Sequence, residues 1–166
     1  MRHAPRTLCA RAAVARAVPV IRTLQEGLGT IPIERVSGIV NGTTNFILSE
    51  MASSGASYEE VLARAQELGY AEADPTDDVE GADAAAKMAI LARLAFHTPV
   101  GLDAVSYEGI TEIRPDDIAY AKELGLSLKL LGVAERHGEG ISVRVFPCLL
   151  YAGHPNWDLL DTIRTR

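Results

Sequence analysis

The chain has 166 residues, 48% of them hydrophobic, and a formal net charge of −6. This size and composition predict a single globular domain with a buried core, and they exclude a disordered or low-complexity protein. Every charged side chain before Glu26 is an arginine, so the rest of the chain is more acidic than the total, which argues against a nucleic-acid-binding surface. The expected ligand is cationic, or zwitterionic with its ammonium group recognised by the protein.

The cysteines and the hydropathy bear on the cellular compartment. Cys9 and Cys148 are the only cysteines, and they have neither metal-binding nor C-x-x-C spacing. No apolar run approaches the roughly 18 residues needed to span a bilayer, and the N-terminus has no uninterrupted apolar stretch typical of a secretory signal. We therefore expect a cytoplasmic protein without a membrane segment.

Three elements are expected in the first third of the chain. Residues 10–28 have helical character, with Pro19 marking a kink or a restart. Residues 33–40 mix β-branched residues at strand length and end at an Asn-Gly turn signal, and a helix is predicted over residues 44–53. A strand, a glycine turn and a helix in this order expose backbone N–H groups to a ligand.

Two further helices are predicted in the middle of the chain. Residues 57–69 form a helix that opens with a Ser–Glu capping box. Asp77 and Glu80 predict a similar cap for the next helix, residues 79–97. The second half of this helix is apolar nearly all round, which predicts a buried central helix.

The last elements complete the predicted fold. Residues 106–110 are expected to form a short strand and residues 114–125 a helix. Residues 126–136 and 141–150 are joined by a glycine-containing turn, which predicts an antiparallel hairpin. This order predicts an α+β fold, with a mixed, largely antiparallel sheet and helices packed on one face.

Asp83 and Lys87 lie four residues apart in the predicted central helix, so their side chains stand one turn apart on one face. Most such pairs are ordinary helix ion pairs. Here the helix is alanine-rich and expected to be buried. A buried lysine has to be paired or to take part in chemistry.

Several carboxylates surround a proline just before this helix. Enrichment of acids at a helix start, for capping and for the helix dipole, explains Asp77 and Asp78 but not Glu72 or Asp74. A site here would hold an ammonium group with its carboxylates while a lysine faced a hydroxyl or carbonyl oxygen. Its candidate residues are Glu72, Asp78, Asp83 and Lys87.

The segment NGTTN, residues 41–45, is a second candidate. Its glycine and hydroxyls at a helix start suit a phosphate, a carboxylate or another polar ligand, although helix capping accounts for the same residues. It has neither a Walker lysine nor a G-x-G-x-x-G pattern. The histidines of the chain have no metal or relay spacing.

Several stretches together resemble the catalytic domain of homoserine dehydrogenases. They are SGIVNGTTNFILSEM (37–51), AQELGYAEADPTDDVEGADAAAKMAIL (65–91), YEGI (107–110) and KLLGVAE (129–135). The central stretch is specific, because its glycines, acids, proline and lysine all fall in register. The resemblance covers roughly residues 12–155.

The resemblance implies an enzyme that interconverts L-aspartate 4-semialdehyde and L-homoserine with NADPH or NADH, in threonine and methionine biosynthesis, as a homodimer. Lys87 then matches the lysine at the reacting oxygen and Asp83 the aspartate beside it. Glu72 and Asp78 match substrate-binding carboxylates. The residues that match the lining of the substrate side are Gly42, Thr43 and Tyr70, of which Gly42 and Thr43 also face the nicotinamide.

The chain also departs from the family pattern. The family carries an amino-terminal Rossmann domain, and the segment after residue 155 returns to complete it; neither is found in this sequence. We therefore expect residues 1–11 to be irregular or remodelled, 12–155 to form the catalytic, substrate and dimerisation domain, and 156–166 to be a truncated tail. The isolated chain is then expected to be inactive, since its main NADP or NAD site would be missing. Arg11 stands where the family has a cation-binding glutamate, so no metal site is expected.

Two alternatives remain open at this level. One is a non-catalytic oligomerisation module that pairs with a full-length partner through its sheet. The other is a module that binds an amino acid of the aspartate family without reacting with it.

Overall fold

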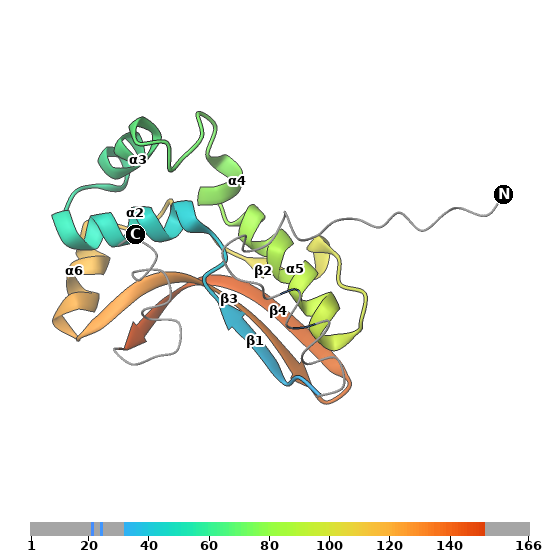
Figure 1. Cartoon of the computed structure of the whole chain (residues 1–166). Helices are drawn as coiled ribbons and strands as arrows, with labels where there is room; N and C mark the ends of the chain where they lie inside the picture. Colours follow the sequence, from blue (N-terminus) through green and yellow to red (C-terminus); the bar gives the residue numbers. More distant parts are fainter. Residues whose placement is uncertain (1–20, 22–23, 25–31, 152–166) are drawn as a thin grey trace.

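The computed structural model describes residues 32–151, together with Ile21 and Leu24. These residues form a four-stranded sheet with the helices on one of its faces, which confirms the predicted α+β fold class (Figure 1). In chain order the elements are β1 (Arg35–Gly38), α2 (Gly42–Ser54), α3 (Tyr58–Glu67), α4 (Thr76–Val79), α5 (Ala82–Phe96), the 3-10 helix η3 (Leu102–Ala104), β2 (Ser106–Tyr107), α6 (Pro115–Glu123), β3 (Leu126–His137) and β4 (Gly140–Tyr151).

The sheet is built around the predicted hairpin of β3 and β4, which pair antiparallel along their whole length. β1 pairs antiparallel with β3, and β2 pairs parallel with β4, so the strand order is β1-β3-β4-β2. Side chains alternate between the two faces. Leu130 and Ala134 lie in the main core beneath the helices, whereas Leu131 and Val133 belong to a second apolar cluster on the opposite face.

α5 is the central helix of the main core and packs on β3 and β4 (Figure 1). Ala85, Met88 and Ala92 are fully buried on the side of α5 that packs into the core. The approach to the sheet is close, because a Cβ added to Gly132 of β3 would lie 2.5 Å from Cγ and Sδ of Met88. The absence of a side chain at Gly132 therefore leaves room for Met88 of α5 against the sheet.

The prediction of one helix over residues 79–97 is wrong, because α4 and α5 are separated at Glu80 and Gly81. Gly81 has a φ of +90°, a left-handed conformation that favours glycine. A Cβ at this position would also lie 2.9 Å from the carbonyl oxygen of Glu108. The N-cap residue of α5 is Gly81 and makes no side-chain cap bond, so the predicted cap that starts from Asp77 is wrong as well.

The ends of other elements differ less from the prediction. α2 begins two residues before the predicted start, with Asn41 as its N-cap, and the capping box of α3 is confirmed. The strand expected at 106–110 is limited to β2, because Gly109 packs against the backbone of Val79 and Glu80. The strand expected at 33–40 is limited to β1.

The ends of the chain carry several of the predictions. The helix expected at 10–28, Arg11 and the tail expected at 156–166 lie outside the described residues, apart from Ile21 and Leu24, which are buried in the main core. Among the described residues, no helix is both long enough and apolar enough to cross a membrane.

Candidate functional site

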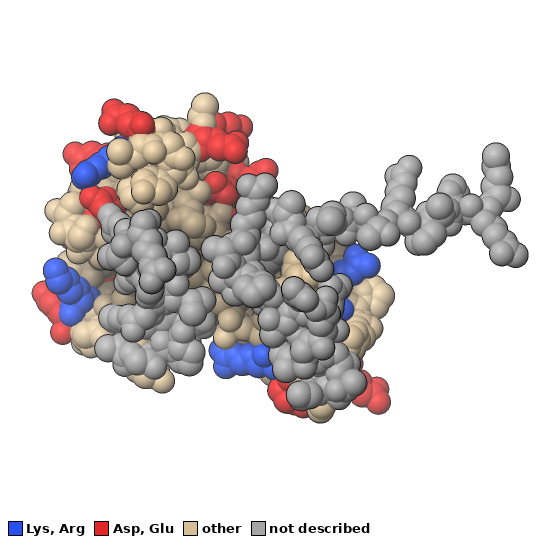
Figure 2. All heavy atoms as spheres, in the orientation of Figure 1, with Lys and Arg blue, Asp and Glu red and all other residues tan. Residues whose placement is uncertain are grey.

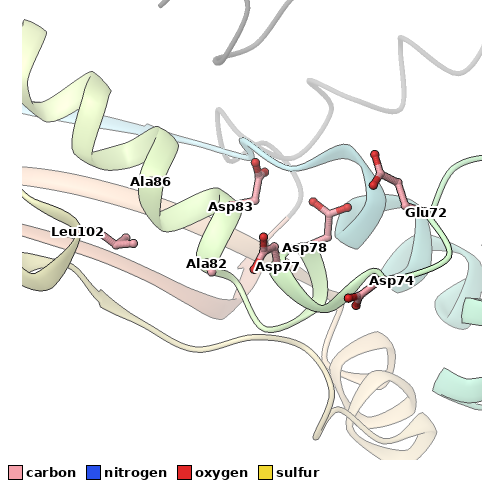
Figure 3. Close-up of a pocket in the computed structure, with 8 residues that line it drawn as sticks. All are labelled: Glu72, Asp74, Asp77, Asp78, Ala82, Asp83, Ala86 and Leu102. Carbon is pink, nitrogen blue, oxygen red and sulfur yellow. The ribbon is translucent and has the colours of Figure 1, made fainter.

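A pocket of about 460 Å³ opens where the loop before α4, α4 itself and the first turn of α5 meet (Figure 3). Five carboxylates dominate its lining, and the remaining side chains are small or apolar. The lining residues are Glu72, Asp74, Asp77, Asp78, Ala82, Asp83, Ala86 and Leu102. Figure 3 shows Glu72, Asp78 and Asp83 projecting toward the same side of the α4–α5 segment, so three of the four residues predicted around one ligand do share a hollow.

Lys87 lies beside this pocket rather than in its lining. Its Nζ is 2.5 Å from Oδ2 of Asp83, one helical turn earlier, as the spacing predicted. The prediction of a buried pair is wrong in degree, because 22% of the Lys87 side chain and 31% of the Asp83 side chain are exposed. The ammonium group is thus held by one carboxylate on a side chain that remains partly exposed.

Asn41 connects the start of α2 to one aspartate of α4 and one aspartate of α5. Its Nδ2 donates to Oδ1 of Asp78 at 2.5 Å and to Oδ2 of Asp83 at 2.9 Å. Its Oδ1 accepts the backbone N–H of Thr44 at 2.8 Å, so the same side chain also caps α2. From the sequence Asn41 was recognised only as part of a turn and of the NGTTN segment, because Asp78 and Asp83 lie 37 and 42 residues away.

Thr43 and Tyr70 border the pocket without lining it. Thr43 Oγ1 lies 3.0 Å from both the carbonyl oxygen of Tyr70 and Oδ2 of Asp78. The ring of Tyr70 is 55% exposed and stacks on Phe46, with ring centroids 4.3 Å apart. Gly42 is exposed at the first position of α2, and no atom lies within 4 Å of where its Cβ would be.

Asp74 has a local structural role that the sequence analysis missed. Its Oδ1 accepts both the backbone N–H of Thr76 at 3.2 Å and the Thr76 hydroxyl at 2.7 Å. This arrangement is an Asx-type turn at the start of α4, and its two hydrogen bonds lower the pKa of the Asp74 carboxyl below its ordinary value. Pro75 is the N-cap residue of α4 and makes no side-chain cap bond, so Asp74 is explained by this turn rather than by capping of the helix.

The acidic character extends beyond the pocket. Figure 2 shows carboxylates gathered at the end of the molecule formed by α3 and α4. The exposed acids of this region are Glu59, Glu60, Glu67, Glu72, Asp74, Asp77 and Glu80. Within the part of the chain that the structure describes, no three or more histidine, cysteine or acidic side chains are grouped so that they could hold a metal ion. The carboxylates give the pocket and its surroundings a negative charge, which attracts cationic groups.

Comparison with known proteins decides the family. A sequence model of the family described as homoserine dehydrogenase matches residues 19–163. The chain belongs to the homoserine dehydrogenase family. Homoserine dehydrogenases from Bacillus subtilis and Mycobacterium leprae are 55% and 56% identical to it over 144 and 149 residues. Each alignment covers 87% of this chain, so the resemblance seen in the sequence motifs is confirmed.

Solved homoserine dehydrogenase structures share the fold as well as the sequence. The structure of the enzyme from Thiobacillus denitrificans superposes with a TM-score of 0.84 at 50% identity, over 87% of this chain and 34% of the other. An archaeal homoserine dehydrogenase solved in complex with NADPH superposes with a TM-score of 0.66 at 27% identity, over 82% of this chain and 38% of the other. The chain spans about a third of the length of the curated relatives it matches.

Proposed function

We propose that residues 12–155 form the substrate-side domain of an oxidoreductase that interconverts L-aspartate 4-semialdehyde and L-homoserine with NADPH or NADH. The observation that carries this proposal is the position of Lys87: its ammonium group rests on Asp83 at the edge of a pocket lined by carboxylates. Family membership adds support, since the relatives matched over most of this chain are named homoserine dehydrogenases. Threonine and methionine biosynthesis is the corresponding pathway.

The carboxylates would bind the amino end of the substrate. Glu72 and Asp78 line the same pocket, and a carboxylate pair offers an ammonium group several acceptors in charge-assisted hydrogen bonds. Thr43, whose hydroxyl lies 3.0 Å from Asp78 Oδ2, holds that carboxylate toward the start of α2. The substrate would then lie with its other end toward Lys87.

Lys87 would act on the reacting oxygen. During reduction of an aldehyde, negative charge develops on the oxygen, and a nearby ammonium group stabilises it and delivers the proton. The Asp83 carboxylate, 2.5 Å from Lys87 Nζ, directs that ammonium group. In the reverse direction the lysine would take the proton from the homoserine hydroxyl.

A nicotinamide dinucleotide, when bound, would supply the hydride. Gly42 and Thr43 fit its nicotinamide end, because the start of α2 is exposed there and no atom lies within 4 Å of the Gly42 Cβ position. The main dinucleotide-binding domain is expected to come from outside these 166 residues, so we propose that the chain alone is inactive. We also propose that the protein forms a homodimer and that it is cytoplasmic. The cytoplasmic location is proposed because the two cysteines lack metal-binding and C-x-x-C spacing, which suits a reducing compartment.

A complementation experiment tests the proposal. The 166-residue chain would be mixed with the separately produced remainder of the Bacillus subtilis relative, the part that this chain does not match, and NADPH oxidation would be followed with L-aspartate 4-semialdehyde. We expect no turnover from either piece, turnover from the mixture, and a loss of about 100-fold or more with Lys87→Ala. Lys122→Ala, on the exposed surface of α6, is the matched control and should retain turnover.

Two results would contradict the proposal. Full turnover by the mixture with Lys87→Ala would show that Lys87 has no role in the reaction. Binding of L-homoserine by the chain, with an inactive mixture, would favour the alternative of a module that binds the amino acid without reacting with it.

A further inference from the structure

Asn41 occupies the point where three elements that carry the candidate site meet. Its Nδ2 donates to Asp78 of α4 and to Asp83 of α5, and Asn41 is also the N-cap residue of α2. The side chain is almost completely buried, with 3% of the residue exposed. We propose that Asn41 is a positioning residue: it fixes the spacing of the Asp78 and Asp83 carboxylates and thereby sets the direction of the Lys87 ammonium group. Its effect on substrate rests on the proposed function.

The orientation of the Asn41 amide is determined by its surroundings. Its Oδ1 accepts from the backbone N–H of Thr44 at 2.8 Å and from the Thr44 hydroxyl at 3.0 Å. Rotating the amide by half a turn would place its NH2 group against an N–H donor and its oxygen against two carboxylates. The NH2 group therefore faces the acids, and its two hydrogens suffice for one bond to each carboxylate.

Asn41 and Lys87 meet on the same atom. Oδ2 of Asp83 accepts from Asn41 Nδ2 at 2.9 Å and from Lys87 Nζ at 2.5 Å. The four-carbon stem of a lysine is flexible, so the direction of its ammonium group depends on where its carboxylate partner is held. The second donor, Asn41, restrains the Asp83 carboxylate and so removes one way in which the ion pair can move.

The bridge also reduces repulsion between the two acids. Two carboxylates that approach one another at the edge of a protein repel, and a shared donor between them offsets this cost. An aspartate at position 41 would still cap α2 but would add a third carboxylate. A serine would also cap α2, yet its single hydroxyl proton cannot serve both acids. The capping role and the bridging role can therefore be separated by substitution.

The test uses the ammonium signals of the chain, which contains three lysines, Lys87, Lys122 and Lys129. In a lysine-labelled sample, Asn41→Ser should move the 15Nζ signal of Lys87, leave that of Lys122 in place, and weaken L-homoserine binding roughly 10-fold, as expected for losing a hydrogen bond to a charged group. Asn41→Ala should give the same signal change with a lower melting temperature, because it also removes the cap.

Thr44→Val is the matched control for stability alone. It removes a buried hydroxyl that bonds to Asn41 but leaves both Asn41 donors in place. We expect a lower melting temperature with an unchanged Lys87 signal and unchanged homoserine affinity. In the wild-type chain, both side-chain amide hydrogens of Asn41 should exchange with water more slowly than those of a free asparagine, which tests the bridge without any substitution.

The outcomes separate this inference from the proposed function. If the wild-type chain does not bind L-homoserine, the proposed function fails, while the Lys87 signal still decides whether Asn41 positions it. An unchanged Lys87 signal in Asn41→Ser would overturn the inference, as would fast exchange of both amide hydrogens. A signal change in Thr44→Val as large as that in Asn41→Ser would also overturn it, since the effect would then follow helix stability.

Discussion

Gly81 and Gly109 lie backbone against backbone at the break between α4 and α5. The position that a Cβ on Gly81 would take is 3.6 Å from Cα of Gly109. The corresponding position on Gly109 is 2.5 Å from Cα of Glu80. Asp78 and Asp83 stand on either side of this break, so the contact between the two glycines shapes the backbone segment that carries both carboxylates.

Gly109→Ala should therefore affect both stability and the site. The added methyl group meets backbone atoms, which cannot move as a flexible side chain can, and overpacking of this kind costs about 1–3 kcal/mol. Urea denaturation would give the free energy of unfolding, and an L-homoserine titration the affinity, which should fall as well. Gly38→Ala is the control, because no atom lies within 4 Å of its Cβ position. Equal stability of the two variants would contradict the close contact.

Gly132 and Met88 predict a second, distinguishable packing effect. A Cβ on Gly132 would lie 2.5 Å from Cγ and Sδ of the fully buried Met88, and these atoms belong to a flexible side chain. Gly132→Ala should cost about 1–3 kcal/mol, and Met88→Ala about 2–5 kcal/mol. In the double variant the alanine methyl occupies part of the emptied space. The loss in free energy of unfolding should therefore be smaller than the sum of the losses in the two single variants. Simple additivity would show that the two residues do not contact.

The Asp74 turn predicts a pKa change. The Thr76 hydroxyl and the Thr76 backbone N–H both bond to Asp74 and lower its pKa, the hydroxyl having the larger effect. Thr76→Val should raise the pKa of Asp74 toward its ordinary value, as followed by carboxyl 13C shifts during a pH titration. Because the folded pKa is the lower one, the turn stabilises the fold above the unfolded pKa and loses that contribution as the pH falls through the folded pKa. An unchanged pKa in the variant would exclude the turn.

Cys148 of β4 is half-buried, and burial raises the pKa of its thiol, while Arg144 acts in the opposite direction. The thiolate fraction at pH 8 is then smaller than in the unfolded chain, so alkylation of Cys148 by iodoacetamide should be slower in the folded chain. Arg144→Ala should slow it further. The folded state also loses stability as the pH rises through this raised pKa. Peptide mass spectrometry would measure the rate, and equal rates in folded and unfolded chains would contradict the shift.

The local parts of the fold were predictable from the sequence because they depend on neighbours in the chain. The capping box of α3 needs only residues three apart, and the Asp83–Lys87 contact needs only one helical turn. The β3–β4 hairpin likewise follows from strand patterns on either side of one turn. These spacings fix geometry without knowledge of the tertiary fold.

The features that the sequence did not predict depend on contacts between residues far apart in the chain. Nothing near Gly81 in the sequence indicates that residues 108–109 will press against it, so the break between α4 and α5 was not predicted. The Asn41 bridge joins residues that are 37 and 42 positions apart, and only the folded chain brings them together. The Asp74 turn, by contrast, is a local feature, because its hydrogen bonds join residues only two positions apart and lower the pKa of the carboxyl.

A crystal structure of the chain with L-homoserine tests the central claim most directly. We predict that the amino group of homoserine lies between Glu72 and Asp78, in the pocket of about 460 Å³, with its hydroxyl within hydrogen-bond distance of Lys87 Nζ. Homoserine bound on another surface, or bound in this pocket with its hydroxyl directed away from Lys87, would contradict the account.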